Sequence, residues 1–136
     1  MQDCLFCKII AGDIPATKVY EDDEVIAFLD IHPVNDGHTL VIPKEHYAML
    51  SDTPDDIAAS LMRVVPHLSR SILKAVGAEA FNIGVNNGKI ASQSVDHVHL
   101  HIIPRFEGDG QIPWHGKKPL SPEDGDRIAN NIRAAL

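Results

Sequence analysis

Apolar residues along this chain follow two different spacings, and polar turns separate the segments that carry them. Runs rich in β-branched and aromatic residues, bounded by turn residues, predict strands. The predicted strands cover residues 18–21, 25–29, 39–42, 81–85 and 97–103. The acidic turn at 21–24 makes the first two strands a hairpin, and a Pro/Gly turn at 33–37 leads into the third.

One long helix is predicted at 54–76. Thr53 is a candidate cap and Pro54 suits the first helical position. Apolar residues then recur at helical spacing until Gly77 ends the segment. Pro66 lies inside this helix, and we expect it to kink the helix because proline removes one backbone hydrogen bond.

Two shorter helical segments complete the pattern, a turn at 5–10 closed by Gly12 and a final helix that opens at Ser121. The order of strands and helices indicates an α+β fold, a five-stranded antiparallel sheet with one long and shorter helices on one face. A length of 136 residues fits one domain, 1–136, in which 107–136 form a C-terminal loop and a short helix.

Charge and hydropathy exclude several classes of partner. Twelve basic against nineteen acidic residues give a net charge of −7, which disfavours binding to a nucleic-acid backbone. The apolar runs are far shorter than the ~18 residues of a membrane span, so no membrane association is expected. The first residues lack the basic and apolar parts of a secretory signal, which favours a cytoplasmic location.

Eight histidines are the unusual feature of the composition, and three of them alternate along one predicted strand. Side chains two residues apart on a strand share a face, so His97, His99 and His101 are expected in a row, about 6.6 Å apart per step. The row is open to three interpretations. It is a polar sheet face, a set of zinc ligands, or a nucleophilic imidazole with a proton-donating neighbour.

The loop before this strand favours the third interpretation. Asn86, Gln93 and Ser94 offer donors suited to phosphate oxygens, and the turn between them exposes backbone N–H groups.

The segment His97-Val98-His99-Leu100-His101-Ile102-Ile103 resembles the signature of the histidine triad (HIT) family, His-φ-His-φ-His-φ-φ with φ apolar. The segments at 37–44 and 93–95 are also similar to that family. The resemblance covers most of the chain, from about Cys4 to Trp114.

The resemblance implies nucleotide chemistry. Family members bind purine nucleotides and hydrolyse or transfer nucleoside monophosphates, from substrates such as adenosine 5′-phosphoramidate or dinucleoside polyphosphates. His99 matches the family nucleophile, which forms a nucleotidyl-imidazole intermediate that water opens. His101 matches the residue that contacts the phosphate and leaving group, and His38 matches a supporting histidine. A regulatory nucleotide-binding module with vestigial hydrolysis is the alternative.

The resemblance also implies a binding pocket. Its phosphate positions are Asn86, Gln93 and Ser94, its ribose position is Asp30, and its base positions are Phe6, Leu29 and Ile31. Ser92 departs from the family, which often has glycine beside the phosphate. A homodimer with a ten-stranded sheet is implied as well, and the family's C-terminal tryptophan, here Trp114, approaches the partner's active site.

Cys4 and Cys7 form a Cys-x-x-Cys pair with three interpretations. A redox pair normally sits in a thioredoxin-like βαβ pattern, which this sequence lacks. Two buried thiols are the second interpretation, and half of a tetrahedral zinc site is the third. Resemblance to bacterial-type HIT proteins and to galactose-1-phosphate uridylyltransferases implies a structural zinc completed by His46 and His97. A rival metallohydrolase would instead place His97, His99 and His101 on one zinc.

Overall fold

The computed structural model describes residues 3–110 and 119–136, so the expected role of Trp114 lies outside the described residues. Its helices are α1 (Leu5–Ala11), α2 (Asp55–Val76) and α3 (Pro122–Ala135), with single 3-10 turns at Leu50–Asp52 and Lys89–Ala91. Its strands are β1 (Lys18–Glu21), β2 (Val25–Leu29), β3 (Thr39–Pro43), β4 (Ala80–Val85) and β5 (Leu100–Arg105).

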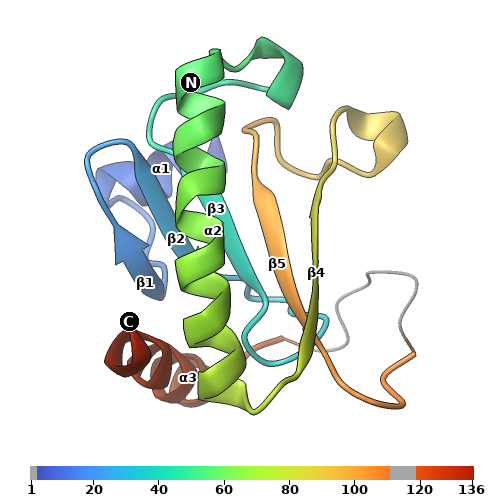
Figure 1. Ribbon diagram of the computed structural model, residues 1–136. Helices are drawn as coiled ribbons and strands as arrows, with labels where there is room; N and C mark the ends of the chain where they lie inside the picture. Colours follow the sequence, from blue (N-terminus) through green and yellow to red (C-terminus); the bar gives the residue numbers. More distant parts are fainter. Residues whose placement is uncertain (1–2, 111–118) are drawn as a thin grey trace.

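The five strands form one antiparallel sheet in the order β1-β2-β3-β5-β4, which confirms the predicted fold class (Figure 1). The segments β2 and β3 are buried at every position, as their apolar composition requires. In the register of the sheet, His101 of β5 lies between Leu40 of β3 and Gly84 of β4. The site histidine therefore sits near the middle of the sheet and not at its edge.

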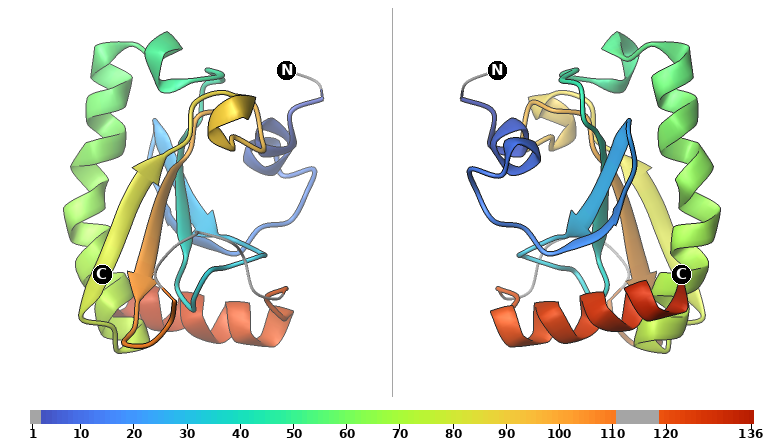
Figure 2. Two further views of the ribbon diagram at one scale, coloured as in Figure 1. Left: turned by 90° about the vertical axis from the view of Figure 1, so that its right-hand side faces the viewer. Right: turned by 90° about the vertical axis from the view of Figure 1, so that its left-hand side faces the viewer.

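The helices lie on both faces of the sheet, contrary to the prediction of one face. Figure 2 shows α2 on one side of the sheet and α1 on the other. Leu100 and Ile102 belong to the core that α2 and α3 cover. Phe6 and Ile9 of α1 instead pack with Ile26, Phe28, Leu40 and Ile42 on the opposite face. Successive side chains of a strand point to opposite faces of the sheet, and those of β2 and β3 are buried on both faces. Each face of these strands therefore needs a covering helix.

The C-terminal helix is part of the main core. The helix α3 starts where the sequence predicts, and Ser121 caps it, because its hydroxyl oxygen accepts the backbone N–H of Asp124 at 3.2 Å. The helix runs for 14 residues and buries Ile128, Ala129 and Ile132. Figure 1 shows α3 beside the lower end of α2, at the β1 side of the sheet.

The helix α2 begins at Asp55, one residue later than the sequence predicts, and its cap differs. The Thr53 hydroxyl donates to the carbonyl of Met49 at 3.0 Å, and Pro54 occupies the cap position without a side-chain bond. The helix continues through Pro66 as one element and ends at Gly77. No helix within the described residues is long and apolar enough to cross a membrane.

The fifth strand starts three residues later than predicted, at Leu100. The backbone N–H of Val98 donates to the carbonyl of Tyr47 at 2.8 Å, outside the sheet ladder. His97 is fully buried, with Nδ1 3.5 Å from Sγ of Cys4 and its ring edge-on to His46 at a centroid distance of 4.9 Å. Residues 97–99 thus lie outside the strand, and of the three histidines only His101 belongs to β5.

Candidate active site

Three imidazoles meet on the α1 face of the sheet. His38 precedes β3, His99 precedes β5, and His101 lies in β5. The ring centroids of His99 and His101 are 5.0 Å apart, and those of His38 and His101 are 5.2 Å apart. His97 does not join this group, because its ring turns toward the cysteines.

Main-chain groups determine which nitrogen of each imidazole carries the proton. The backbone N–H of Val34 donates to Nδ1 of His38 at 3.0 Å, so neutral His38 is protonated at Nε2. That Nε2–H donates a hydrogen bond to Nδ1 of His101 at 2.9 Å, so neutral His101 is protonated at Nε2. Two imidazoles are thereby placed in one hydrogen-bonded chain.

His99 has the opposite arrangement. Its Nδ1 lies 2.8 Å from the carbonyl oxygen of His97 and donates to it. The lone pair of neutral His99 is therefore at Nε2, which is the requirement for a nucleophile. The site pairs one imidazole that offers a lone pair with one that offers an N–H.

Burial keeps these imidazoles neutral. It lowers the pKa of His38 and of His99, and the carboxylate of Asp30 only partly opposes this effect. Burial, followed by the nearby His99 and His38, lowers the pKa of His101 to about 4. Neutral imidazoles are the form that attacks phosphorus, so the buried environment suits nucleophilic chemistry near pH 7.

The carboxylate of Asp30 joins the histidine chain from the end of β2. Its Oδ2 lies 3.6 Å from Nε2 of His38, and its Oδ1 accepts the backbone N–H of His32 at 2.8 Å. Asp30, His38 and His101 bring ligand atoms within 4.8 Å of one another, as a metal site would. A metal bound to Nε2 of His38 would require the ring proton to be on Nδ1. That proton would then face the backbone N–H of Val34, which is itself a donor. The group therefore fits a hydrogen-bond chain better than a metal site.

A cavity of about 370 Å³ opens beside these groups. This size falls in the range of small-molecule sites. Most of the residues predicted to bind nucleotide line it, namely Phe6, Leu29, Asp30, Ile31, Ser94, His99 and His101. One end is apolar and the other presents the carboxylate and the imidazoles. The sequence prediction missed further walls of the cavity, which include Leu5, Ile9, Ile14, Phe28 and Leu40. The spacing of Leu5 and Ile9 on one helical face is the signal for two of them.

Gln93 and Asn86, the other predicted phosphate contacts, do not line this cavity. Gln93 is buried, and its Nε2 donates to the carbonyls of Ala48 and Val95 at 2.7 and 2.9 Å. Its Oε1 accepts the backbone N–H of Gly88 at 2.7 Å. An amide has two N–H donors and both are used, so Gln93 holds the 88–95 loop and has no N–H left for phosphate.

Ser92, in the same loop, has a backbone φ of +73°. This left-handed conformation favours glycine, which lacks the Cβ that crowds the following carbonyl. The glycine expected here from the family resemblance is thus explained by the backbone, and serine adopts the same conformation at a local cost in energy.

The second cluster holds Cys4, Cys7, His46 and His97, whose ligand atoms lie within 4.8 Å of one another. Nδ1 of His97 lies 3.5 Å from Sγ of Cys4, and Nδ1 of His46 lies 3.3 Å from Sγ of Cys7. A tetrahedral ion with normal zinc bond lengths separates sulfur and nitrogen ligands by about 3.6 Å. The four residues fit zinc in both donor type and spacing.

The surroundings of this cluster also favour a cation. Nε2 of His97 donates to the carbonyl of Pro43 at 2.8 Å, which leaves the lone pair of Nδ1 facing the sulfurs. Burial and the adjacent Cys4 raise the pKa of the Cys7 thiol. A divalent cation would offset this effect by stabilising the thiolate.

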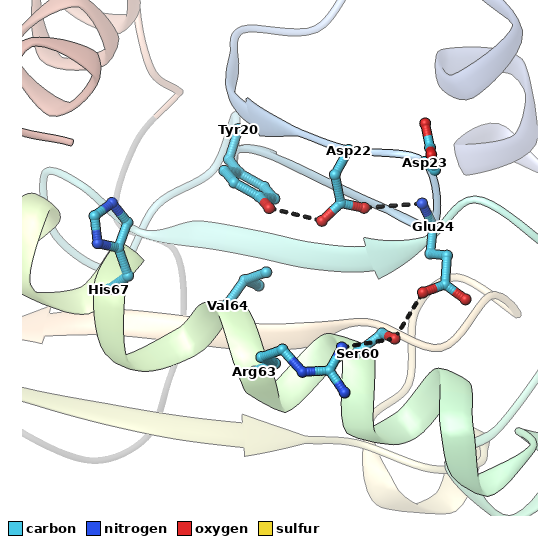
Figure 3. Close-up of a pocket in the computed structure, with 8 residues that line it drawn as sticks. All are labelled: Tyr20, Asp22, Asp23, Glu24, Ser60, Arg63, Val64 and His67. Carbon is cyan, nitrogen blue, oxygen red and sulfur yellow. Dashed lines mark hydrogen bonds between the residues drawn. The ribbon is translucent and has the colours of Figure 1, made fainter.

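A second cavity, of about 410 Å³, lies between the β1–β2 hairpin and α2. Figure 3 shows hydrogen bonds among several of its polar side chains. The Tyr20 hydroxyl donates to Asp22 at 2.6 Å, and the Ser60 hydroxyl donates to Glu24 at 2.9 Å (Figure 3). The first pair lies within the hairpin and the second joins the hairpin to α2, on the opposite side of the sheet from the three imidazoles.

Comparison with known proteins gives consistent matches. An uncharacterised HIT-like protein of Methanocaldococcus jannaschii is 52% identical over 130 residues, which are 96% of this chain and 98% of the relative. An adenosine 5′-monophosphoramidase of Schizosaccharomyces pombe is 43% identical over 136 residues, 96% of this chain and 98% of the relative.

Solved structures agree. A HIT-like protein of Bartonella henselae superimposes with a TM-score of 0.92 at 38% identity, covering 100% of this chain and 98% of its own. A Zn-bound histidine triad family protein of Mycobacterium smegmatis gives a TM-score of 0.79 at 38% identity, covering 98% and 93%. The HIT domain family itself matches residues 11–108. The chain therefore belongs to the histidine triad family.

Proposed function

We propose that this protein is a nucleotide hydrolase or transferase that releases a nucleoside monophosphate from a purine nucleotide phosphoramidate or phosphoanhydride. The main support is the pair of complementary imidazoles, His99 with its lone pair at Nε2 and His101 with its proton at Nε2. The Schizosaccharomyces pombe relative, an adenosine 5′-monophosphoramidase, supports an adenosine phosphoramidate as substrate.

In this proposal the nucleotide lies along the 370 Å³ cavity. The base packs in the apolar end against Phe6, Leu29 and Ile31, and the Asp30 carboxylate accepts hydrogen bonds from the ribose hydroxyls. Nε2 of His99 attacks phosphorus as the bond to the leaving group breaks. The His97 carbonyl, which already accepts the Nδ1 proton, stabilises the positive charge that develops on the His99 ring.

His101 contributes a hydrogen bond from Nε2–H to the phosphate and leaving group. His38 holds His101 in this tautomer through the hydrogen bond to its Nδ1, and the Asp30 carboxylate lies beside Nε2 of His38. Water then opens the nucleotidyl-His99 intermediate and releases the monophosphate. Phosphate contacts for Ser94 and Asn86 remain part of the proposal, and Ser94 lines the cavity.

The proposal assigns a structural zinc to Cys4, Cys7, His46 and His97. With four protein ligands the ion has no open position, so it stiffens the fold and does not activate water. The Zn-bound relative from Mycobacterium smegmatis supports this assignment.

The proposal also includes a homodimer that pairs the β4 edges into a ten-stranded sheet. The strand β4 is at the edge of the sheet. Its residues Phe81 and Ile83 have exposed fractions of 40% and 41%. These alternate with Asn82 and so share a face with Val85, which packs on the core under α2. An apolar edge strand of this kind favours pairing with a second chain.

The test is AMP release from adenosine 5′-phosphoramidate by wild type and His99→Ala, at saturating substrate, with and without a chelator. We expect wild-type turnover to survive chelation and the variant to lose a few orders of magnitude. Calorimetric titration with AMP shows whether the His99→Ala pocket is intact. A wild type that binds AMP without turnover indicates the regulatory module instead. Turnover that disappears with the metal, in protein that stays folded, indicates metal catalysis.

A further inference from the structure

The two histidine clusters share α1. Cys4 caps this helix, because its Sγ accepts the backbone N–H of Cys7 at 3.4 Å, and Cys7 lies in the first turn. Leu5, Phe6 and Ile9 of the same seven-residue helix line the cavity. One short element therefore carries two zinc ligands and one wall of the nucleotide pocket.

Phe6 lies between the two clusters. Its ring is edge-on to His99, at a centroid distance of 5.1 Å, and edge-on to His97, at 5.9 Å. The Phe6 ring thus touches a proposed zinc ligand and the proposed nucleophile at the same time. A shift of α1 changes the packing around both rings.

Two kinds of contact hold α1 against the sheet, the packing of Phe6 and Ile9 on the apolar side chains of β2 and β3 and the contacts of the two cysteines with His46 and His97. A helix of seven residues is too short to be stable by itself. Only Phe6 and Ile9 are buried among its residues, and both are walls of the cavity. In the absence of metal, the attachment of its first turn to His46 and His97 consists of thiol–imidazole contacts of 3.3–3.6 Å.

We propose that the Cys4–Cys7–His46–His97 site controls nucleotide affinity, because its metal anchors α1 as the wall of the pocket. The inference rests on the proposed nucleotide pocket and zinc site. Metal loss frees the first turn of α1 and withdraws Phe6 from the pocket. Nucleotide binding orders Phe6 and so preorganises the cysteines for metal.

Thermodynamic linkage makes the coupling reciprocal, which supplies the test. AMP affinity is measured by calorimetry on zinc-loaded and on metal-free protein, and zinc affinity by competition with a chromophoric chelator with and without saturating AMP. We expect zinc to tighten AMP binding about tenfold and AMP to tighten zinc binding by the same factor. Turnover at saturating substrate changes much less than KM.

Two variants separate coupling from simple stabilisation of the fold. Phe6→Leu keeps all four ligands, and we expect its AMP affinity to be lower and independent of zinc. The matched control Leu40→Val alters a cavity wall on β3, outside α1. We expect this control to lower AMP affinity while zinc still tightens binding by the wild-type factor.

Hydrogen exchange of the α1 amides gives a readout that does not depend on activity. Exchange is expected to be fast in metal-free protein and slow when zinc or AMP is bound. Equal AMP affinities with and without zinc, in folded protein, overturn the coupling and leave the proposed hydrolase intact. Zinc-loaded protein that binds no AMP overturns both.

Discussion

At the scale of single residues, the main chain assigns the chemical roles of identical side chains. His38, His99 and His101 are chemically the same imidazole, yet a backbone N–H fixes one tautomer and a backbone carbonyl fixes another. A histidine pattern in a sequence indicates that such chemistry is present. The partners of Nδ1 determine which ring offers a lone pair at Nε2 and which ring offers an N–H there.

Gly37, which precedes His38, offers a stability test at this scale. It has φ +89°, and a Cβ placed on it would lie 3.0 Å from Cγ1 of Val76 and 3.1 Å from Cγ2 of Ile72. Gly37→Ala combines left-handed strain with overpacking, and we expect it to lower the free energy of unfolding by about 2–5 kcal/mol. Urea denaturation measures the loss.

Gly77→Ala is the matched control for that substitution. Gly77 has φ +72° but nothing lies within 4 Å of the position of a Cβ. Only the conformational cost applies, and we expect a loss of about 1–2 kcal/mol. Equal losses at the two positions would show that the close approach to α2 contributes nothing.

At the scale of elements, the exposed edge of β4 makes the dimer testable. Ile83→Glu places a charge on the apolar edge, and we expect it to convert a dimer into a monomer because a buried unpaired charge is costly. Sedimentation velocity measures the assembly state. Ile90→Glu is the control, since Ile90 is fully exposed on the loop after β4. A dimer that survives Ile83→Glu would place the interface elsewhere.

Element boundaries also show where local prediction ends. The end of α1 at Gly12, the start of α3 after Ser121 and the β1–β2 hairpin follow from nearby residues, and the structure confirms all three. The predicted start of the fifth strand at His97 is wrong, because Val98 pairs with Tyr47 and the His97 ring packs against Cys4. A period-two pattern contains no information about such distant partners.

At the scale of the whole molecule, buried imidazoles make stability depend on pH. The folded protein holds the pKa of His101 at about 4, against 6.5 for an ordinary histidine, and burial lowers the pKa of His38 in the same direction. As the pH falls below 6.5 the unfolded chain takes up protons first. The contribution of the neutral imidazoles to the free energy of unfolding is therefore complete above pH 6.5 and is lost progressively down to about pH 4.

We expect His101 alone to contribute on the order of 2–3 kcal/mol to this acid-side loss. Urea denaturation at pH 7.5, 5.5 and 4.5 measures it in wild type and His101→Gln, and the variant is expected to have a shallower dependence on pH. His67→Gln, at an exposed position of α2, is expected to retain the wild-type profile. Identical profiles for all three proteins would contradict the assignment.

The sequence by itself determined the order of strands and helices, the family, and seven of the sixteen residues that line the cavity. Those features depend on short-range information, namely periodicity, turn residues and the spacing of histidines and cysteines. The prediction of helices on one face was wrong, since α1 covers the other face. The prediction that Gln93 donates to phosphate also conflicts with its hydrogen bonds inside the loop.

The family resemblance implies that the histidines divide between two clusters, but only the tertiary structure gives the contacts that hold each cluster together. His101 meets His38 across 63 positions of sequence, and His97 meets Cys4 across 93. The placement of β5 between β3 and β4 brings these residues together. Contacts over such separations come from the packing of the whole sheet and from the backbone groups it positions. No local pattern of residue types specifies them.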